Sequence, residues 1–451
     1  MNIKVLLWLD VEDYINLQSD DALLLLLDTL KSKGVKAILK IVGEKARVLK
    51  ERGRYDILEK IKEHEIGYHT NMHSVHPTIA EYLEPLGFRE GAYEFERNEG
   101  NGFKDVASII SKNPEVYGQP GRDWAPQVFP VLRKWLVHSY ICTVRRINIA
   151  RKPCWYGGLL SMCYLNGQTR MELVEGGLEE GKRTFDETCK RLSDQNTGFV
   201  SIFYHPCEFA TTNFWDAYNF SNGENTPRNE WKGAPLRSKE EMIHYVDMFG
   251  QYIDYILSKD NVEFITLSEA LALEKSNNTG ICAEDVKIIA EEIGTEVYFY
   301  SNNNINLSAS EIFSLFCNYI NDEPFNPELI YGPENYFTTN ITEKVKVSDI
   351  KQAVKVKYPR IYDYKQLPDY FTINGKYINP IDMTCTLAKI IKDGLTDNDS
   401  VEVVRGCLKS RIHVEEKDDL TNWIVFRKNF QVPNIRKMAG LQAWTLKPAL
   451  F

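Results

Sequence analysis

Strand-like and helix-like segments alternate along the first 275 residues, and this order restricts the fold more than any other feature. The strand-like runs are mostly apolar and comprise residues 3–9, 36–42, 65–68, 115–117, 154–160, 198–204 and 262–266. Such runs are typical of strands covered on both faces, as in parallel sheets. The helix-like segments between them include residues 43–62, 105–111, 127–135, 177–192 and 237–258. The order predicts a β/α fold.

Polar residues follow directly after three of these strand-like runs. Asp10 ends the first run, His69 follows residues 65–68, and His205 follows residues 198–204. In parallel β/α barrels the carboxyl ends of the strands meet at one face, and that face carries the chemistry. We therefore expect the three side chains to share one site. The long segment 209–236, rich in aromatic and polar residues, is a further candidate for a functional loop.

Histidine is concentrated in one short stretch. The chain has eight histidines, and four of them fall within residues 64–77. His69 and His73 are four residues apart, so on one helical turn they would share a face and converge on a metal ion. The alternative is a solvated or capping cluster at a strand end.

A catalytic metal site of the zinc type needs three protein ligands and one open position. His69 and His73 supply two, and the third is a carboxylate that follows the first strand. Glu12 and Asp13 compete for this role. We prefer Glu12, because Asp10 and Glu12 alternate along the strand and point to one side. This ligand set suits zinc, and also cobalt, nickel or iron.

Asp10 and His205 remain for proton transfer. Asp10 is the candidate general base for the water that a metal activates. His205 is the candidate general acid for the leaving amine, since an imidazole is readily charged near neutral pH. The alternative for His205 is a buried histidine that is hydrogen-bonded to backbone.

Length and composition limit the class of protein. With 451 residues the chain is long enough for two or three domains. The formal charge of −9, with no long basic run, argues against a nucleic-acid partner. No apolar run reaches the roughly 18 residues that a membrane helix needs, and the N-terminal run is too short for a signal peptide. Nine cysteines without a Cys-x-x-Cys pair fit reduced thiols. We expect a cytoplasmic protein with no membrane partner, and the sequence leaves its oligomeric state open.

The pattern changes after residue 280. We expect a catalytic domain over 1–275, a smaller, mostly helical accessory domain of two repeat-like units over 283–400, and an extension over 401–451 that packs on the body. The pair Asn374-Gly375 predicts a hairpin turn.

The first 275 residues resemble the polysaccharide deacetylases, the NodB-like family 4 of the carbohydrate esterases. Residues 64–73 are similar to the family motif His-(Ser/Thr)-x-x-His, which implies that His69 and His73 are the metal pair. Residues 10–13 resemble a variant of the first motif, which holds the base and a ligand, and residues 203–208 resemble the motif whose histidine is the acid. Residues 262–270 are similar to the closing strand and helix. The resemblance implies a distorted, incomplete (β/α) barrel.

One family feature is missing. The motif that normally supplies an arginine to orient the base corresponds to Gly118-Gln119-Pro120, which has none; Arg122 or a residue elsewhere would have to replace it. Asp123 and Trp124 occupy positions at which the family places residues that line the site. His76, just past the ligand turn, is a candidate substrate contact, whereas His64 is expected to be structural.

A second, weaker resemblance concerns residues 367–375, which are similar to the pseudomurein-binding repeat. It would imply attachment to a cell-wall glycan.

These features lead to three hypotheses. The first is a metal-dependent hydrolase of an amide C–N bond that removes an acetyl group from an N-acetylated sugar or saccharide conjugate. The second keeps the metal but places a non-sugar amide, cyclic or linear, in the site. The third is a non-catalytic glycan-binding protein.

Overall fold

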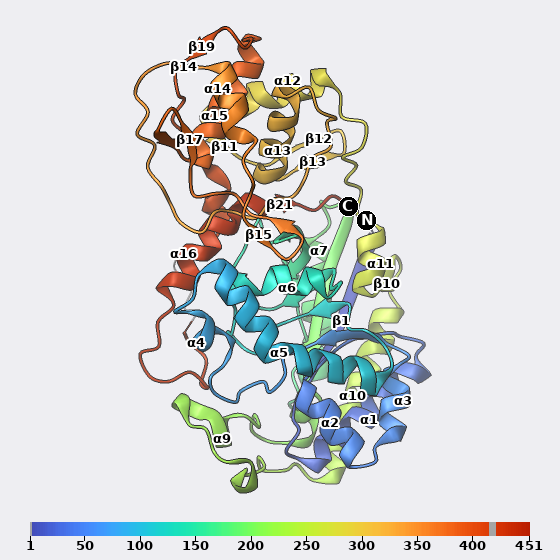
Figure 1. Ribbon diagram of the computed structural model, residues 1–451. Helices are drawn as coiled ribbons and strands as arrows, with labels where there is room; N and C mark the ends of the chain where they lie inside the picture. Colours follow the sequence, from blue (N-terminus) through green and yellow to red (C-terminus); the bar gives the residue numbers. More distant parts are fainter. Residues whose placement is uncertain (1, 415–420) are drawn as a thin grey trace.

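The computed structural model describes residues 2–414 and 421–451, and its main feature is one curled sheet (Figure 1). Among the described residues this sheet has eleven strands. They are β1 (Asn2–Val11), β2 (Ile38–Ile41), β3 (Glu65–Tyr68), β4 (Val116–Tyr117), β5 (Ser139–Cys142), β6 (Cys154–Tyr156), β7 (Leu159–Cys163), β8 (Gly167–Gln168), β9 (Thr197–Tyr204), β10 (Val262–Phe264) and β21 (Lys447–Pro448).

The strand order is β21-β6-β7-β5-β4-β3-β2-β1-β9-β8, and β10 pairs with the first residues of β1. All neighbours are parallel except at one edge, where β6 runs antiparallel to both β7 and β21. The two ends of this order, β21 and β8, do not pair with each other, so the barrel stays open. The expected distorted, incomplete (β/α) barrel is thereby confirmed.

Helices cover the sheet, as the alternating sequence predicts. They are α1 (Leu17–Ser32), α2 (Gly43–Glu51), α3 (Tyr55–Ile61), α4 (Ile79–Leu83), α5 (Phe88–Ile110), α6 (Phe129–Lys134), α7 (Gly177–Arg191), α8 (Pro206–Ala210), α9 (Ala217–Phe220), α10 (Lys239–Leu257) and α11 (Leu267–Ala272), with short 3-10 turns η1 (Pro126–Val128), η2 (Ser221–Gly223) and η3 (Arg228–Glu230).

The central strand β1 is buried on both faces. Leu7 and Leu9 belong to the large core on one face, whereas Leu6 and Trp8 belong to a smaller core on the other. All four side chains are at most 2% exposed. This is the arrangement that a continuous apolar run in a parallel sheet requires.

Residues 154–160 form more than the single strand expected. They contain β6 and the start of β7, which pair antiparallel around Gly157 and Gly158. Both glycines have positive φ, 59° and 85°, which side chains other than glycine rarely adopt. Two adjacent glycines in an apolar run therefore marked a turn.

The region after residue 280 contains helices and small strand pairs. Its elements are α12 (Ala283–Ile293), β11 (Glu296–Val297), β12 (Tyr300–Asn302), β13 (Ile305–Leu307), α13 (Ala309–Ile320), β14 (Val345–Lys346), α14 (Val347–Val354), β15 (Arg360–Ile361), β16 (Tyr364–Lys365), β17 (Phe371–Ile373), β18 (Lys376–Ile378), α15 (Pro380–Asp393), β19 (Ser400–Val401), β20 (Cys407–Leu408), η4 (Lys409–His413), α16 (Pro433–Leu441) and η5 (Gln442–Thr445). The predicted hairpin at Asn374 and Gly375 is confirmed, because β17 and β18 pair across these two residues of positive φ.

The C-terminal helices lie far from the carboxyl ends of the strands. In Figure 1, α12 to α15 lie at the top, above the point where β1 begins, and α9 lies at the bottom. The last part of the chain returns to the sheet, where β21 pairs with β6 and Trp444 is 1% exposed. No helix in the described part of the chain combines the length and the apolarity needed to cross a membrane.

Candidate metal centre and active site

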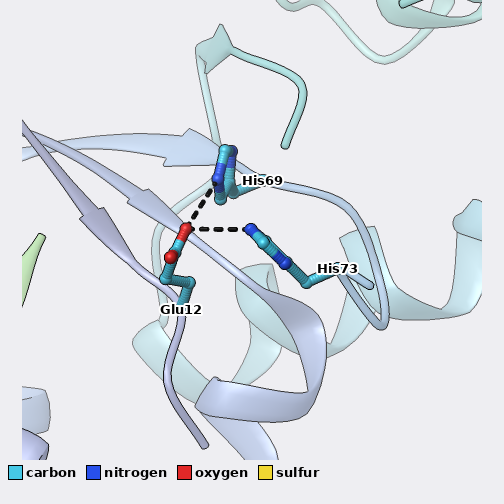
Figure 2. Close-up of side chains that lie close together, drawn as sticks. All are labelled: Glu12, His69 and His73. Carbon is cyan, nitrogen blue, oxygen red and sulfur yellow. Dashed lines mark hydrogen bonds and ion pairs between the residues drawn. The ribbon is translucent and has the colours of Figure 1, made fainter. Parts of the chain in front are cut away.

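Glu12, His69 and His73 meet beyond the carboxyl ends of β1 and β3 (Figure 2). The Glu12 Oε2 atom lies 3.2 Å from His69 Nε2 and 2.9 Å from His73 Nε2. The three side chains are almost fully buried, with exposed fractions of 2%, 1% and 5%. Three ligand-type atoms thus face one point from the ends of two strands that flank β2.

The two histidines do not sit on a helical turn, so that prediction is wrong. Thr70 and His73 have positive φ, 68° and 56°, and the segment is an irregular loop. Contacts to neighbouring elements fix it: Gly43 N donates to Thr70 O at 2.9 Å, and Asn71 N donates to Glu99 Oε2 at 2.7 Å. Tertiary hydrogen bonds, rather than i,i+4 spacing, bring the imidazoles together.

The outer atom of each ligand is held by a specific partner. His69 Nδ1 donates to the carbonyl of Gly118 at 2.6 Å, and Trp215 Nε1 donates to Glu12 Oε1 at 2.9 Å. His73 Nδ1 lies 2.6 Å from Ser74 Oγ, and that hydroxyl donates onward to Asp216 at 3.1 Å.

These partners fix the tautomers. A carbonyl only accepts, and the Ser74 hydroxyl already uses its proton, so both Nδ1 atoms carry hydrogen and both Nε2 atoms are left to face Glu12. Such outer partners are typical of metal ligands. Ligands placed tetrahedrally at about 2.0–2.2 Å from a cation lie roughly 3.3–3.6 Å apart. The observed separations of 2.9 and 3.2 Å fit this after a slight expansion.

The charges also suit a cation. Burial opposes ionisation of Glu12, but the charges of His73 and His205 outweigh it and hold the pKa of Glu12 well below its ordinary value. Burial lowers the pKa of His69, which favours the neutral imidazole that a metal ligand must be. For His73 the charge of Glu12 outweighs burial and raises the pKa, so a bound cation would have to displace a proton from this imidazole.

Asp13, the competing carboxylate, is used elsewhere. Its Oδ1 accepts hydrogen bonds from the backbone of Ile15 and Asn16, at 2.9 and 3.0 Å, and its Oδ2 accepts from Ser19. These contacts hold the chain at the start of α1. Between the two candidates, the structure turns only Glu12 toward the imidazoles.

Asp10 lies between two cationic groups beside the three-residue cluster. Its Oδ1 is 2.8 Å from Lys40 Nζ, and its Oδ2 is 3.5 Å from His205 Nε2 and 3.8 Å from His69 Nε2. Burial alone would raise the pKa of Asp10, but the facing His69, Lys40 and His205 side chains lower it strongly. Asp10 is therefore ionised and free to accept a proton.

Lys40 is the residue that the sequence analysis missed. It is 1% exposed in the middle of β2, and its Nζ also lies 4.1 Å from the Trp8 ring. It provides the cationic partner of Asp10, whereas Gln119 accepts a hydrogen bond from Tyr140. A lysine inside an otherwise apolar strand was the available signal, because lysine is almost never fully buried without a partner.

His205 is held on the opposite side of Asp10. It precedes α8, and its Nδ1 lies 3.4 Å from Glu208 Oε2, which in turn lies 3.2 Å from Arg170. Burial would lower the pKa of His205, but the carboxylates of Glu12 and Glu208 raise it well above its ordinary value. The imidazole is therefore cationic, as a general acid requires.

Three expected substrate contacts lie away from the cavity. Asp123 accepts hydrogen bonds from Ile79 N and Ala80 N at the start of α4, at 2.8 and 2.6 Å. Trp124 is 4% exposed within the core. His76 is bound by Glu81, at 2.7 Å. None of the three lines the cavity described below, so their assignment to the substrate stays a prediction. His64, expected to be structural, accepts a hydrogen bond at its Nδ1 from the backbone N–H of Ala37, at 3.0 Å.

Asp10, Glu12, His73 and His205 line a cavity of about 240 Å³. Its polar side holds Asp10, Glu12, Lys40 and His205. Its aromatic side is formed by Trp8, Phe203, Phe214 and Trp423. Phe214 comes from the long segment 209–236, which the sequence analysis marked as functional, and Trp423 comes from the C-terminal extension.

Glu99 supports the loop that carries His69 and His73, and this support depends on pH. Its carboxyl accepts from Tyr68 Oη and Asn71 N, both at 2.7 Å, and burial raises its pKa to about 7. Because this pKa lies above that of an exposed glutamate, 4.5, the stabilisation from the protonated form is complete below pH 4.5 and is lost as the pH rises through about 7. The difference in free energy of unfolding between Glu99→Gln and wild type should therefore shift in favour of the variant by on the order of 3 kcal/mol as the pH rises from 5 to 8. Urea titrations at both pH values measure this.

The exposed Glu90 on the same helix provides the control. Glu90→Gln should follow the wild-type pH dependence. An identical pH dependence for Glu99→Gln and wild type would show that Glu99 is ionised throughout.

Comparisons with known proteins found similarity in the backbone structure alone. No family model matches the chain, and no curated protein matches it. Nor does any family model support the pseudomurein-binding resemblance. A candidate polysaccharide deacetylase from Mycobacterium smegmatis is 12% identical with a TM-score of 0.40, and the match covers 60% of this chain and 90% of that one.

Other solved structures are similar at the same level. A 4-alpha-glucanotransferase from Thermococcus litoralis is also 12% identical with a TM-score of 0.40, over 60% of this chain and 40% of that one. A variant of a peptidoglycan deacetylase from Bacillus subtilis is 12% identical with a TM-score of 0.30, over 60% and 91%. Family 4 carbohydrate esterases recur among these structures. At this level of similarity, the assignment of function depends on the geometry of the site.

Proposed function

We propose that this chain is a metal-dependent hydrolase of an amide C–N bond, and that its reaction is N-deacetylation of an N-acetylated sugar or saccharide conjugate. One observation carries the proposal: two imidazole Nε2 atoms and one carboxylate oxygen face a single point, while a partner holds the outer atom of each. A buried carboxylate and a half-buried imidazolium stand beside that point.

Glu12, His69 and His73 would hold the cation, which is zinc or else cobalt, nickel or iron. When bound, such a cation polarises a carbonyl group and makes water more acidic. Glu12 brings one negative charge and the two imidazoles are neutral ligands, so the site retains a net positive charge that favours an acyl oxygen.

Asp10 would accept the proton of the attacking water. The Lys40 ion pair at 2.8 Å keeps the carboxylate ionised and fixes its orientation, which leaves the second oxygen toward the cavity. In the resting site the neighbouring cations keep the proton affinity of this carboxylate low. Negative charge that develops nearby during the reaction would offset these cations, so that the carboxylate can take up the proton.

His205 would deliver a proton to the leaving nitrogen. Glu208 holds its Nδ1 side, and the Nε2–H points toward Asp10 and the cavity. Amine departure needs this proton, since an amide anion is too basic to leave. The acid and the base thus stand on the same cavity wall, 3.5 Å apart.

A non-sugar amide, cyclic or linear, is the second candidate. The observation that favours it is the aromatic lining of Trp8, Phe203, Phe214 and Trp423, which suits a flat or apolar substrate as well as a sugar ring.

A release assay separates these functions. The full chain, with and without added Zn²⁺ or Co²⁺, is incubated with N-acetylated sugars and with cyclic and linear amides. We expect metal-dependent acetate release from at least one N-acetylated sugar. Turnover of a non-sugar amide alone would select the second candidate, and no turnover of either class in metal-loaded protein would contradict the hydrolase assignment.

A further inference from the structure

Two segments that are far apart in the sequence meet beside the cavity. Asn222 N donates to Ile424 O at 2.8 Å, and Gly223 N donates to Val425 O at 2.9 Å. Val425 is fully buried and belongs to a small apolar cluster together with Trp215 and Phe220. Backbone pairing and apolar packing therefore fix the extension against the long loop 209–236.

This arrangement places Trp423 at the cavity. Its indole lies against the imidazole of His73, with ring centroids 5.9 Å apart. The chain leaves room for it at Gly121, where a Cβ atom would lie 2.6 Å from the indole. Any side chain at that position would displace Trp423, so the site is shaped around this ring.

Phe214 closes the other side. Its ring stands edge-on to His205, with centroids 5.0 Å apart, and it comes from the same long loop that binds the extension. The remaining aromatic wall is the stacked pair of Trp8 and Phe203, 5.1 Å apart. The aromatic rings beside the reacting groups therefore come from β1, β9, the long loop 209–236 and the C-terminal extension.

The size of this space limits the substrate. At about 240 Å³ the cavity is smaller than the roughly 300–1,000 Å³ typical of pockets for drug-sized ligands. An internal residue of a glycan chain needs an open groove with two exits, because the polymer continues on both sides. A single sugar unit needs only one.

We propose, on the basis of the hydrolase function above, that Trp423 roofs the site and restricts the substrate to a free N-acetylated monosaccharide. The terminal units of an oligosaccharide do not fit. Internal residues of a polysaccharide are excluded. The C-terminal extension, which is remote in sequence from the catalytic strands, thereby determines specificity.

The test compares N-acetylglucosamine with its β-1,4-linked tetramer on the full metal-loaded chain. Ligand-observed NMR measures binding, and acetate release measures turnover. Wild type should bind and deacetylate the monomer, with kcat/KM for the tetramer at least tenfold lower. Trp423→Ala should raise the tetramer-to-monomer ratio of kcat/KM by at least tenfold, and Trp423→Phe should give an intermediate ratio in a protein that keeps an aromatic ring against His73.

Ile424→Ala is the matched control, because Ile424 adjoins Trp423 but is 56% exposed and does not line the cavity. It should keep the wild-type ratio. Equal binding of monomer and tetramer by wild type, or no binding of either, would overturn the size restriction whether or not acetate is released. Selective binding of the monomer without acetate release would leave the restriction in place and contradict the hydrolase function.

Discussion

Replacing Asp10 by asparagine is expected to lower kcat about 10²–10⁴-fold on any substrate that the chain hydrolyses, because an amide nitrogen takes no proton from water. The bound cation should remain, since Asp10 Oδ2 lies 3.8 Å from His69 Nε2, outside the cluster of Glu12 and the two histidines. Steady-state kinetics and metal analysis of the same preparation check both parts. A variant with full metal content and wild-type kcat would show that Asp10 is not the base.

Lys40 complicates this variant and also provides its control. Asp10→Asn leaves the Lys40 ammonium buried without its carboxylate, which should cost about 3–5 kcal/mol in free energy of unfolding. The double variant Asp10→Asn with Lys40→Met removes both charges and should recover most of that loss, while kcat stays low. If the double variant regained activity together with stability, the role of Asp10 would be structural.

The sheet was predictable because its signals are local. The apolar runs at 65–68 and 198–204 correspond to β3 and β9 within one residue at either end. The pairing of β21 with β6 could not be predicted, because it joins residues almost 300 positions apart. A two-residue strand such as β21 is also too short to show an alternating hydrophobic pattern.

The site was predictable in its residue types and less so in its geometry. Spacing identified His69 and His73, but the helical turn that the spacing implied is a loop fixed by hydrogen bonds from α2 and to α5. Asp123 stands close in sequence to a site motif, yet its carboxylate serves the start of α4. Position along the chain does not give the direction of a side chain.

The groups that complete the site come from distant segments. Trp215 binds the outer oxygen of Glu12 from the long loop, and Trp423 reaches His73 from the extension. The sequence predicted that loop 209–236 is functional and that the extension packs on the body. Which of their aromatic residues reach the cavity depends on tertiary packing, for which a single sequence offers no periodic signal.

The largest binding effect should come from the three-residue cluster. Changes to outer partners of metal ligands typically weaken binding about 10–100-fold, so loss of a ligand itself should cost more than about 100-fold. His73→Ala removes one of two imidazoles, and Glu12→Gln removes the one negative charge of the cluster. His244→Ala is the matched control, because His244 is an exposed histidine on α10.

Metal content tests the central claim most directly. Elemental analysis of the purified chain after equilibration with Zn²⁺ and gel filtration should give about one equivalent in wild type and in His244→Ala. His73→Ala and Glu12→Gln, shown to be folded by circular dichroism, should retain almost none. Wild-type protein without bound metal, or folded variants that retain a full equivalent, would contradict the metal centre formed by Glu12, His69 and His73.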